Sequence, residues 1–304
     1  MTKRSPARFG AVATAMVTPF DEGGGLDLDG AAGLGKYLAD NGSEAVVLAG
    51  TTGEAPVLTD TERLDLFRAL AETLTIPVIA GSTTNDTAHS VAITRAAEEA
   101  GVAAILAVTP YYNRPSQLGL TRHFTAVAQA TSLPVILYDI PIRTGRKIAT
   151  ETILRLAREV PNIVGVKDAA GDVAGTARLL AEAPEGFECY SGEDALNLPL
   201  LSVGAVGAIS VASHWVGREM SEMITAFLAG DAEGARQLNA QILDFVAFQS
   251  SDDAPNPMPA KAMLRAMGLP AGQCRLPHGP APEWLEERAG SVLADLEEWR
   301  AARG

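Results

Sequence analysis

Short apolar segments alternate with helix-like segments along the first two thirds of the chain, with a repeat of roughly 30 residues. The apolar segments are rich in valine, isoleucine, leucine and alanine, as expected for strands that are buried on both faces. The segments between them place apolar residues at helical spacing. We predict eight strands, at residues 11–17, 45–49, 78–80, 104–108, 135–138, 163–167, 187–190 and 208–211.

Turn and cap signals support the predicted helices. Asn41-Gly42 predicts the end of the first helix, and Thr59 with Glu62 predicts a capping box at the start of the second. Eight strands that alternate with helices predict an α/β fold, a parallel sheet closed into a (β/α)8 TIM barrel. A doubly wound open sheet is the alternative. No Gly-x-Gly-x-x-Gly motif follows the first strand, however, so a dinucleotide site is not expected.

The pattern changes after the eighth unit, where the chain reads as helices only. We therefore divide the chain into a barrel, residues 1–215, and a C-terminal helical extension packed on the barrel, residues 216–304. The segment 253–259, with three prolines, is the clearest linker.

Composition narrows the class of protein. The formal net charge of −13 argues against binding to nucleic acid or to an anionic membrane, because both require basic patches. No apolar run is long enough to cross a membrane. The basic start, residues 1–8, precedes a short apolar run that we interpret as the first strand and not as a signal peptide. The two cysteines, Cys189 and Cys274, have no metal-type spacing, and a disulfide is not expected. We expect a cytoplasmic protein.

Lys167 lies near the carboxyl end of the predicted strand 163–167, the end at which TIM barrels carry their active sites. Burial disfavours an ammonium and lowers the pKa of a lysine, and a neutral amine can condense with a carbonyl group. A lysine that reaches solvent beyond the strand is the alternative. The remaining lysines fall outside the predicted strands: Lys3, Lys36, Lys147 and Lys261.

Further polar residues fall at the ends of other strands. Tyr111, Tyr112 and Tyr138 are three of the five tyrosines; a phenol near an amine can transfer protons, although ordinary aromatic packing also explains each of them. Thr51 and Thr52 could bind a small carboxylate or relay protons, although Gly-Thr-Thr-Gly is also a common turn. The remaining candidates are Arg143, Gly192 and Ser210. An arginine there could hold a carboxylate through two hydrogen bonds, or form a surface ion pair.

A metal centre is poorly supported. The four histidines show no two-histidine spacing. Four carboxylates near strand ends could hold a magnesium ion: Asp139, Asp168, Glu193 and Asp194. Helix capping explains Asp168 and Glu193 more simply.

Taken together, these motifs resemble the dihydrodipicolinate synthase / N-acetylneuraminate lyase family of class I aldolases, along essentially the whole chain. The resemblance is carried by Gly50-Thr51-Thr52-Gly53-Glu54, Thr109-Pro110-Tyr111-Tyr112-Asn113-Arg114-Pro115, Tyr138-Asp139-Ile140-Pro141, Gly165-Val166-Lys167-Asp168-Ala169 and Ser191-Gly192-Glu193-Asp194. It implies small-molecule substrates, a homotetramer built as a dimer of dimers, and no cofactor or metal, the only covalent group being an imine of Lys167 with pyruvate.

The resemblance also implies roles for single residues. Lys167 would form the Schiff base with pyruvate, and Tyr138 would donate and accept the proton beside it. Thr51 and Tyr112 would complete a proton relay, the tyrosine reaching in from a neighbouring subunit. The substrate-binding positions it implies are Thr52, Ile209, Arg143 and Gly192.

The second substrate is implied by Arg143, which resembles the arginine that guides a semialdehyde carboxylate in the synthase branch. The tail motif Asn256-Pro257-Met258-Pro259-Ala260-Lys261 resembles that branch too. We therefore expect condensation of pyruvate with L-aspartate 4-semialdehyde to 4-hydroxy-tetrahydrodipicolinate, in lysine and diaminopimelate synthesis. Asp139 and Ile142 depart from the commoner Asn and Ser. They keep open a pyruvate aldolase acting on a sugar acid or another 2-keto-3-deoxy substrate. A non-catalytic sensor would lack Lys167 or Tyr138, and both are present.

Feedback control is a separate expectation from the same resemblance. Lysine-inhibited members bind the effector at a subunit interface, and the matching positions here are Ala55, Asp60, Arg63, Asn85, His89 and Tyr111. Only Asn85 and Tyr111 fit the most sensitive pattern. We hypothesise weak or absent inhibition by lysine.

Overall fold

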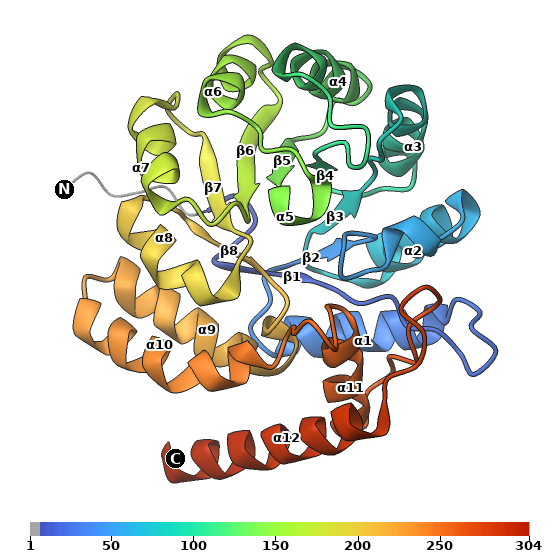
Figure 1. The fold of residues 1–304 in the computed structure, drawn as a ribbon, viewed down its shortest axis with the longest axis vertical. Helices are drawn as coiled ribbons and strands as arrows, with labels where there is room; N and C mark the ends of the chain where they lie inside the picture. Colours follow the sequence, from blue (N-terminus) through green and yellow to red (C-terminus); the bar gives the residue numbers. More distant parts are fainter. Residues whose placement is uncertain (1–6, 304) are drawn as a thin grey trace.

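The computed structural model describes residues 7–303, so most of the basic start and Lys3 lie outside the described residues. Eight parallel strands close into a barrel in the order of the sequence, which confirms the predicted TIM barrel and excludes the open sheet (Figure 1). The strands are β1 (Val12–Ala15), β2 (Ala45–Leu48), β3 (Val78–Gly81), β4 (Ala104–Val108), β5 (Val135–Asp139), β6 (Ile163–Asp168), β7 (Glu188–Ser191) and β8 (Gly207–Ser210).

Helices follow each strand and surround the barrel (Figure 1). They are α1 (Leu28–Asp40), η1 (Ala55–Val57), α2 (Asp60–Thr73), α3 (Thr87–Glu99), α4 (Gln117–Gln129), α5 (Pro141–Thr144), α6 (Thr150–Glu159), α7 (Val173–Glu182), η2 (Asp194–Leu196), α8 (Asn197–Val203) and α9 (Ser213–Leu228). The capping box of Thr59 and Glu62 is present at the start of α2, and α1 ends at Asn41, as predicted.

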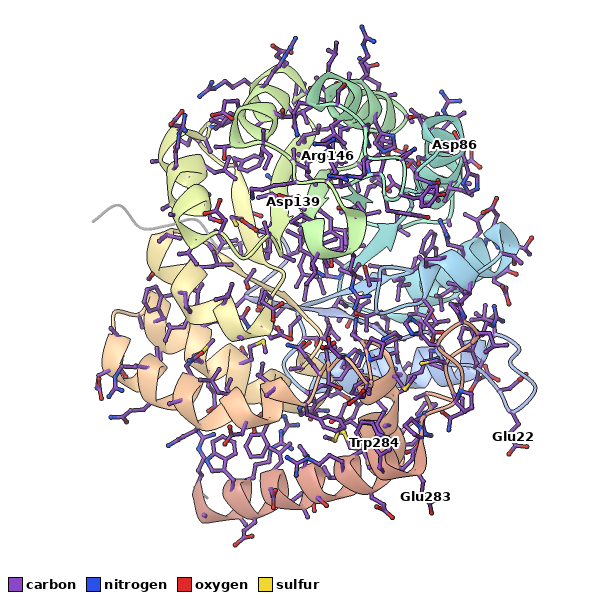
Figure 2. All side chains as sticks on the ribbon, in the orientation of Figure 1. Glu22, Asp86, Asp139, Arg146, Glu283 and Trp284 are labelled. Atoms are coloured by element: carbon purple, nitrogen blue, oxygen red, sulfur yellow. The ribbon has the colours of Figure 1, made fainter. Side chains whose placement is uncertain are left out.

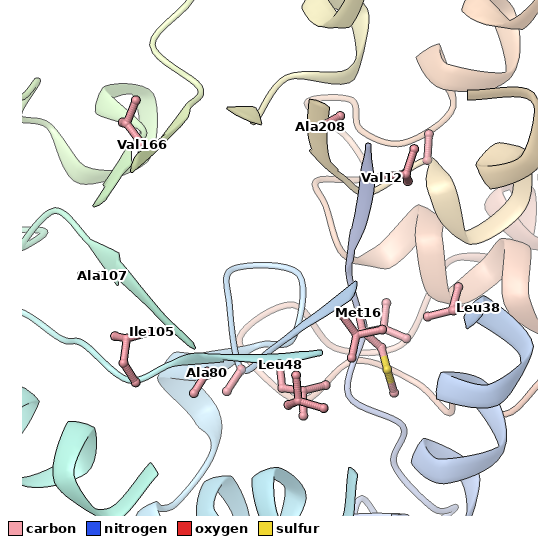
Figure 3. Close-up of a cluster of buried hydrophobic side chains, with 14 of the residues drawn as sticks. Val12, Met16, Leu38, Leu48, Ala80, Ile105, Ala107, Val166 and Ala208 are labelled. Atoms are coloured by element: carbon pink, nitrogen blue, oxygen red, sulfur yellow. The ribbon is translucent and has the colours of Figure 1, made fainter. Parts of the chain in front are cut away.

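Alternation along the strands separates two apolar layers, because successive side chains of a strand point to opposite faces. Residues such as Ala13, Leu106 and Ile136 fill the interior of the barrel. Their neighbours in sequence, including Val12 and Ile105, pack outward beneath the helices (Figure 3). This register decides which polar side chains at the strand ends enter the barrel.

The C-terminal part of the chain is helical, as predicted. It contains α10 (Ala232–Ala247), α11 (Met258–Ala266) and α12 (Glu283–Arg303), which lie together at one side of the barrel (Figure 1). The division at 215/216 falls within α9, which packs on β1 and α1, and it stays a prediction. The last helix is fastened to α9 by Arg300, whose Nε lies 2.6 Å from Glu219 Oε1.

Charged side chains such as Glu22, Asp86 and Glu283 lie at the periphery of the molecule (Figure 2). Within the described range, none of the helices has the length and apolarity of a membrane span.

Candidate active site

Lys167 enters the barrel from β6. Val166 and Asp168 point outward, so the alternation of the strand turns Lys167 inward, where the side chain is 4% exposed. Its register partner on β5 is Tyr138, and the Lys167 Nζ atom lies 4.3 Å from the centroid of the tyrosine ring. The sequence therefore identified two side chains that the fold brings into contact.

Lys167 differs from Lys147 and Lys261 in having no counter-ion among the described residues. Lys147 pairs with Asp139 at 3.4 Å, and Lys261 pairs with Glu54 at 2.6 Å. Within residues 7–303, no such ion pair involves Lys167. Lys167 does act on the Glu193 carboxylate at longer range, where its charge partly offsets the rise in the pKa of Glu193 that burial causes.

Gly192 makes room for the stem of Lys167. A Cβ atom added at Gly192 would lie 2.9 Å from both Cγ and Cε of Lys167, and 3.0 Å from Cβ of Ala169. Such distances are well inside the usual carbon–carbon contact of about 3.5–4.0 Å. A glycine at the end of β7 thus allows the lysine to pass beside the backbone.

A cavity of about 270 Å³ opens at the carboxyl ends of the strands. Thr51, Tyr138 and Arg143 line it, together with Tyr111 and His278. Most of its wall is apolar, with a few polar groups, which is the usual composition of a small-molecule site. Four of the strand-end residues that the sequence singled out, Thr51, Tyr111, Tyr138 and Arg143, therefore share one cavity.

Thr52 is buried beside this cavity and contacts the C-terminal part of the chain. The Asn256 side-chain amide donates a hydrogen bond of 3.0 Å to the Thr52 hydroxyl oxygen. The main-chain oxygen of Asn256 accepts a hydrogen bond of 3.3 Å from Arg143. Sequence reasoning placed Asn256 in a linker and missed its position between two candidate substrate-binding residues; the tail motif was the signal for it.

Glu54 and Lys261 form a buried ion pair next to Thr52. The two side chains are 1% and 0% exposed, and Lys261 Nζ also donates to the main-chain oxygen of Gln273. Burial lowers the pKa of Lys261, and the Glu54 carboxylate opposes this effect. Glu54 itself has φ +55°, a left-handed conformation that is uncommon for a residue with a Cβ. The ion pair therefore holds the turn that carries Thr51 and Thr52.

Tyr112 does not join the cavity of its own chain. Its side chain is 92% exposed and its φ is +71°, whereas the preceding Tyr111 lines the cavity. Ile209 lies at the opposite extreme, buried among the interior side chains of the barrel. The contribution of Tyr112 from a neighbouring subunit stays a prediction.

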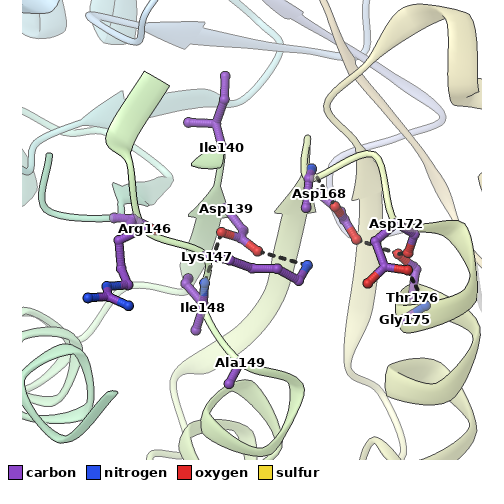
Figure 4. Close-up of polar contacts among 12 residues, drawn as sticks. Asp139, Ile140, Arg146, Lys147, Ile148, Ala149, Asp168, Asp172, Gly175 and Thr176 are labelled. Atoms are coloured by element: carbon purple, nitrogen blue, oxygen red, sulfur yellow. Dashed lines mark hydrogen bonds and ion pairs between the residues drawn. The ribbon is translucent and has the colours of Figure 1, made fainter. Parts of the chain in front are cut away.

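The acidic residues beside Tyr138 and Lys167 point away from the interior. The Asp139 carboxylate accepts a hydrogen bond of 3.1 Å from the Ile148 main chain and contacts Lys147, while Asp168 accepts from Thr176 (Figure 4). Burial raises the pKa of Asp139 to about 6.

These contacts leave Asp139 and Asp168 occupied outside the cavity. Asp194 is also used, because its carboxylate accepts from the main-chain nitrogens of Val211 and Ala212. The expectation that Asp168 caps a helix was wrong, because Asp172 is the N-cap of α7. Glu193 does stand at the N-cap position of η2, but its side chain makes no capping hydrogen bond there.

The positions matched to the effector site lie on η1, α2 and α3 and in the loops after β3 and β4. Arg63 donates to the main-chain oxygen of Ala55 at 2.9 Å, and His89 contacts the Asp60 carboxylate at 2.9 Å. Arg63 also lines the cavity, so a cation entering this region meets a guanidinium group.

Comparisons with known proteins agree with this architecture. The model of the dihydrodipicolinate synthetase family matches residues 8–295. A 4-hydroxy-tetrahydrodipicolinate synthase from Moorella thermoacetica is 48% identical over 95% of this chain and 98% of its own. The crystal structure of a dihydrodipicolinate synthase from Bacillus anthracis has a TM-score of 0.91 at 43% identity, covering 95% of this chain and 98% of its own. That of the synthase from Cyanidioschyzon merolae with lysine bound has a TM-score of 0.92 at 40% identity, covering 95% and 98%.

Proposed function

We propose that this chain, which belongs to the dihydrodipicolinate synthetase family, condenses pyruvate with L-aspartate 4-semialdehyde to 4-hydroxy-tetrahydrodipicolinate. It is a lyase of lysine and diaminopimelate biosynthesis. The observation that carries the proposal is the position of Lys167, which is buried at the carboxyl end of β6 with its amine over the ring of Tyr138 and, among residues 7–303, without an ion-pair partner.

The chemistry begins with attack of Lys167 Nζ on the keto carbon of pyruvate, followed by loss of water to give an imine. The imine withdraws electrons, so the pyruvate methyl group loses a proton and becomes an enamine. The enamine carbon then attacks the aldehyde carbon of the second substrate. The amine of that substrate displaces Nζ from the imine carbon, which closes the ring and frees the enzyme. The imine supplies the electron sink, so the scheme requires no cofactor.

The Tyr138 phenol is proposed as the proton donor and acceptor for these steps, because its ring lies against Lys167. Thr51, which lines the same cavity, would pass protons between Tyr138 and Tyr112 of a neighbouring subunit. We propose a homotetramer, a dimer of dimers, on the basis of this relay. Thr52 and Ile209 would bind pyruvate, and Gly192 would admit the lysine. A cytoplasmic location is proposed from the biosynthetic role.

Arg143 is proposed to bind the carboxylate of the semialdehyde. It lines the cavity and is steadied by the main-chain oxygen of Asn256. The two unusual residues of this loop do not oppose the assignment. Asp139 faces away from the cavity, and Ile142 is 89% exposed. Among the described residues that line the cavity, neither Asp139 nor Ile142 is found.

Borohydride reduction tests the covalent step. Reduction in the presence of pyruvate should add the mass of the reduced adduct to the single peptide that contains Lys167, and Lys167→Ala should abolish the adduct. Labelling of another lysine, or none in the wild type, would refute the imine.

Substrate assays test the second step. The wild type should consume L-aspartate 4-semialdehyde when pyruvate is added, and Arg143→Ala should raise KM for the semialdehyde while sparing pyruvate. Activity with sugar-derived aldehydes alone would refute the synthase assignment in favour of the pyruvate aldolase. Tyr138→Phe should keep the fold and lower kcat by roughly 10²–10⁴-fold.

A further inference from the structure

The segment that joins α10 to α11, together with the first turn of α11, reaches back across the carboxyl end of the barrel and contacts the turn after β2 at two points. Asn256 contacts Thr52, and Lys261 contacts Glu54. Both contacts are buried, and both join residues more than 200 positions apart in the sequence. The segment is therefore part of the wall behind the pyruvate-binding turn.

The contact at Thr52 has a defined direction. The Asn256 amide is the donor, so the Thr52 hydroxyl oxygen is the acceptor at 3.0 Å. The hydroxyl group still has its own proton to donate, and within residues 7–303 no protein acceptor for that proton is found. Because the Thr52 hydroxyl oxygen accepts from Asn256, the hydroxyl proton points away from that amide and is available to a ligand acceptor.

The burial of Asn256 is not explained by packing alone. Its side chain is buried, yet within the described residues its Oδ1 atom has no hydrogen-bond partner. A buried amide with one unpaired atom costs free energy, so a well-packed apolar side chain would be the more stable choice. The hydrogen bond to Thr52 is the one contact that requires an amide at this position.

We propose that Asn256 is a positioning residue for pyruvate: its amide fixes the Thr52 hydroxyl so that the proton of this hydroxyl points at the pyruvate carboxylate. The inference rests on the proposed function, in which Thr52 binds that carboxylate. Asn256 does not touch the reacting atoms and acts through Thr52.

The two contacts of Asn256 predict a selective effect. The side chain holds Thr52, but the contact with Arg143 uses the main-chain oxygen, which every substitution retains. Loss of the side chain should therefore weaken the binding of pyruvate and leave the binding of the semialdehyde unaffected. A general destabilisation of the structure would instead weaken the binding of both substrates.

The experiment measures pyruvate binding without the second substrate, as the pyruvate concentration that gives half-maximal borohydride trapping at Lys167. Asn256→Ala should raise this concentration by about 10-fold, the effect expected for one oriented hydrogen bond to a charged group. KM for the semialdehyde should change less than about 2-fold, well below that value. Asn162→Ala is the matched control: the side-chain amide of this asparagine is also a hydrogen-bond donor, but to main-chain oxygens at the opposite end of β6, and the variant should leave trapping unchanged.

Asn256→Asp tests the direction of the hydrogen bond. A carboxylate can only accept from Thr52, so it would take the hydroxyl proton away from pyruvate, and trapping should weaken at least as much as in Asn256→Ala. Trapping like that of the wild type would show that an oxygen already faces Thr52, and would overturn the inference.

The double variant separates positioning from a direct role. In a Thr52→Val background, Asn256→Ala should have no further effect on trapping, because the two residues act as one unit. Additive effects would overturn the inference. In each of these outcomes the wild type still traps pyruvate at Lys167; its failure to do so would instead refute the proposed function.

Discussion

Gly192→Ala should damage catalysis through the position of a single side chain. The added methyl group would lie 2.9 Å from Cγ and Cε of Lys167, whereas carbon atoms normally remain about 3.5–4.0 Å apart. The backbone at Gly192 does not have a positive φ, so alanine brings no backbone strain. The difference between these distances requires a shift of roughly 0.5–1 Å, which the lysine stem can make more easily than the strands.

A misplacement of about 1 Å at a reacting group costs roughly 10²-fold in rate. We therefore expect kcat to fall by about this factor, and the rate of borohydride trapping to fall with it, whereas overpacking should lower the free energy of unfolding by only about 1–3 kcal/mol. Mass spectrometry of samples quenched at successive times measures the rate of borohydride trapping, and urea denaturation measures the free energy of unfolding.

The control is Gly33→Ala in α1, where an added Cβ meets no atom within 4 Å. That variant should keep the wild-type kcat and gain up to about 1 kcal/mol in stability, because alanine favours a helix. If Gly192→Ala also kept the wild-type kcat and trapping rate, the close passage of Lys167 beside Gly192 could not be what positions the amine.

Three further predictions concern stability and control. Lys261→Met leaves the buried Glu54 carboxylate unpaired and should cost about 3–5 kcal/mol in urea denaturation at pH 7; an unchanged midpoint would contradict the pairing. Burial lowers the pKa of His123 and of His214 to about 4, so the unfolded chain, with histidine pKa near 6.5, binds protons first as the pH falls. Each histidine should therefore reduce the free energy of unfolding, by up to roughly 3 kcal/mol, as the pH is lowered from about 6.5 to 4. Asp139, with its pKa raised to about 6, opposes this over part of the range; stability that does not fall between pH 6.5 and 4 would contradict the histidine assignment. Finally, lysine should inhibit weakly or not at all, and half-maximal inhibition below 1 mM in a steady-state assay would refute that expectation.

The sequence predicted those parts of the fold that depend on local pattern. The strand 104–108 was predicted to the residue, and the capping box of Thr59 and Glu62 was found as expected. Lys167 and Tyr138 were identified separately, and the register of β5 and β6 brought them together. Apolar alternation and cap residues operate over a few positions, so they can be seen without coordinates.

Contacts between parts of the chain that are distant in sequence could not be predicted from local pattern. The segment 253–259 has the composition of a linker, and nothing local to Asn256 indicates that its amide meets Thr52. The orientation of Asp139 was likewise unknown, because a strand end next to an active site does not show which face its last side chain takes. The family resemblance identified the motifs, whereas the orientation of their side chains became known only from the structure.

The reach of the C-terminal segment to the turn after β2 has a consequence for biosynthesis of the protein. A ribosome releases the eight strands well before residues 256–261, and until those residues emerge, Thr52 has no amide to accept from and Glu54 no cation beside it. The turn that carries Thr51 and Thr52 can therefore acquire these two contacts only late in translation, and a chain truncated before residue 256 leaves the Glu54 carboxylate without Lys261 as its partner.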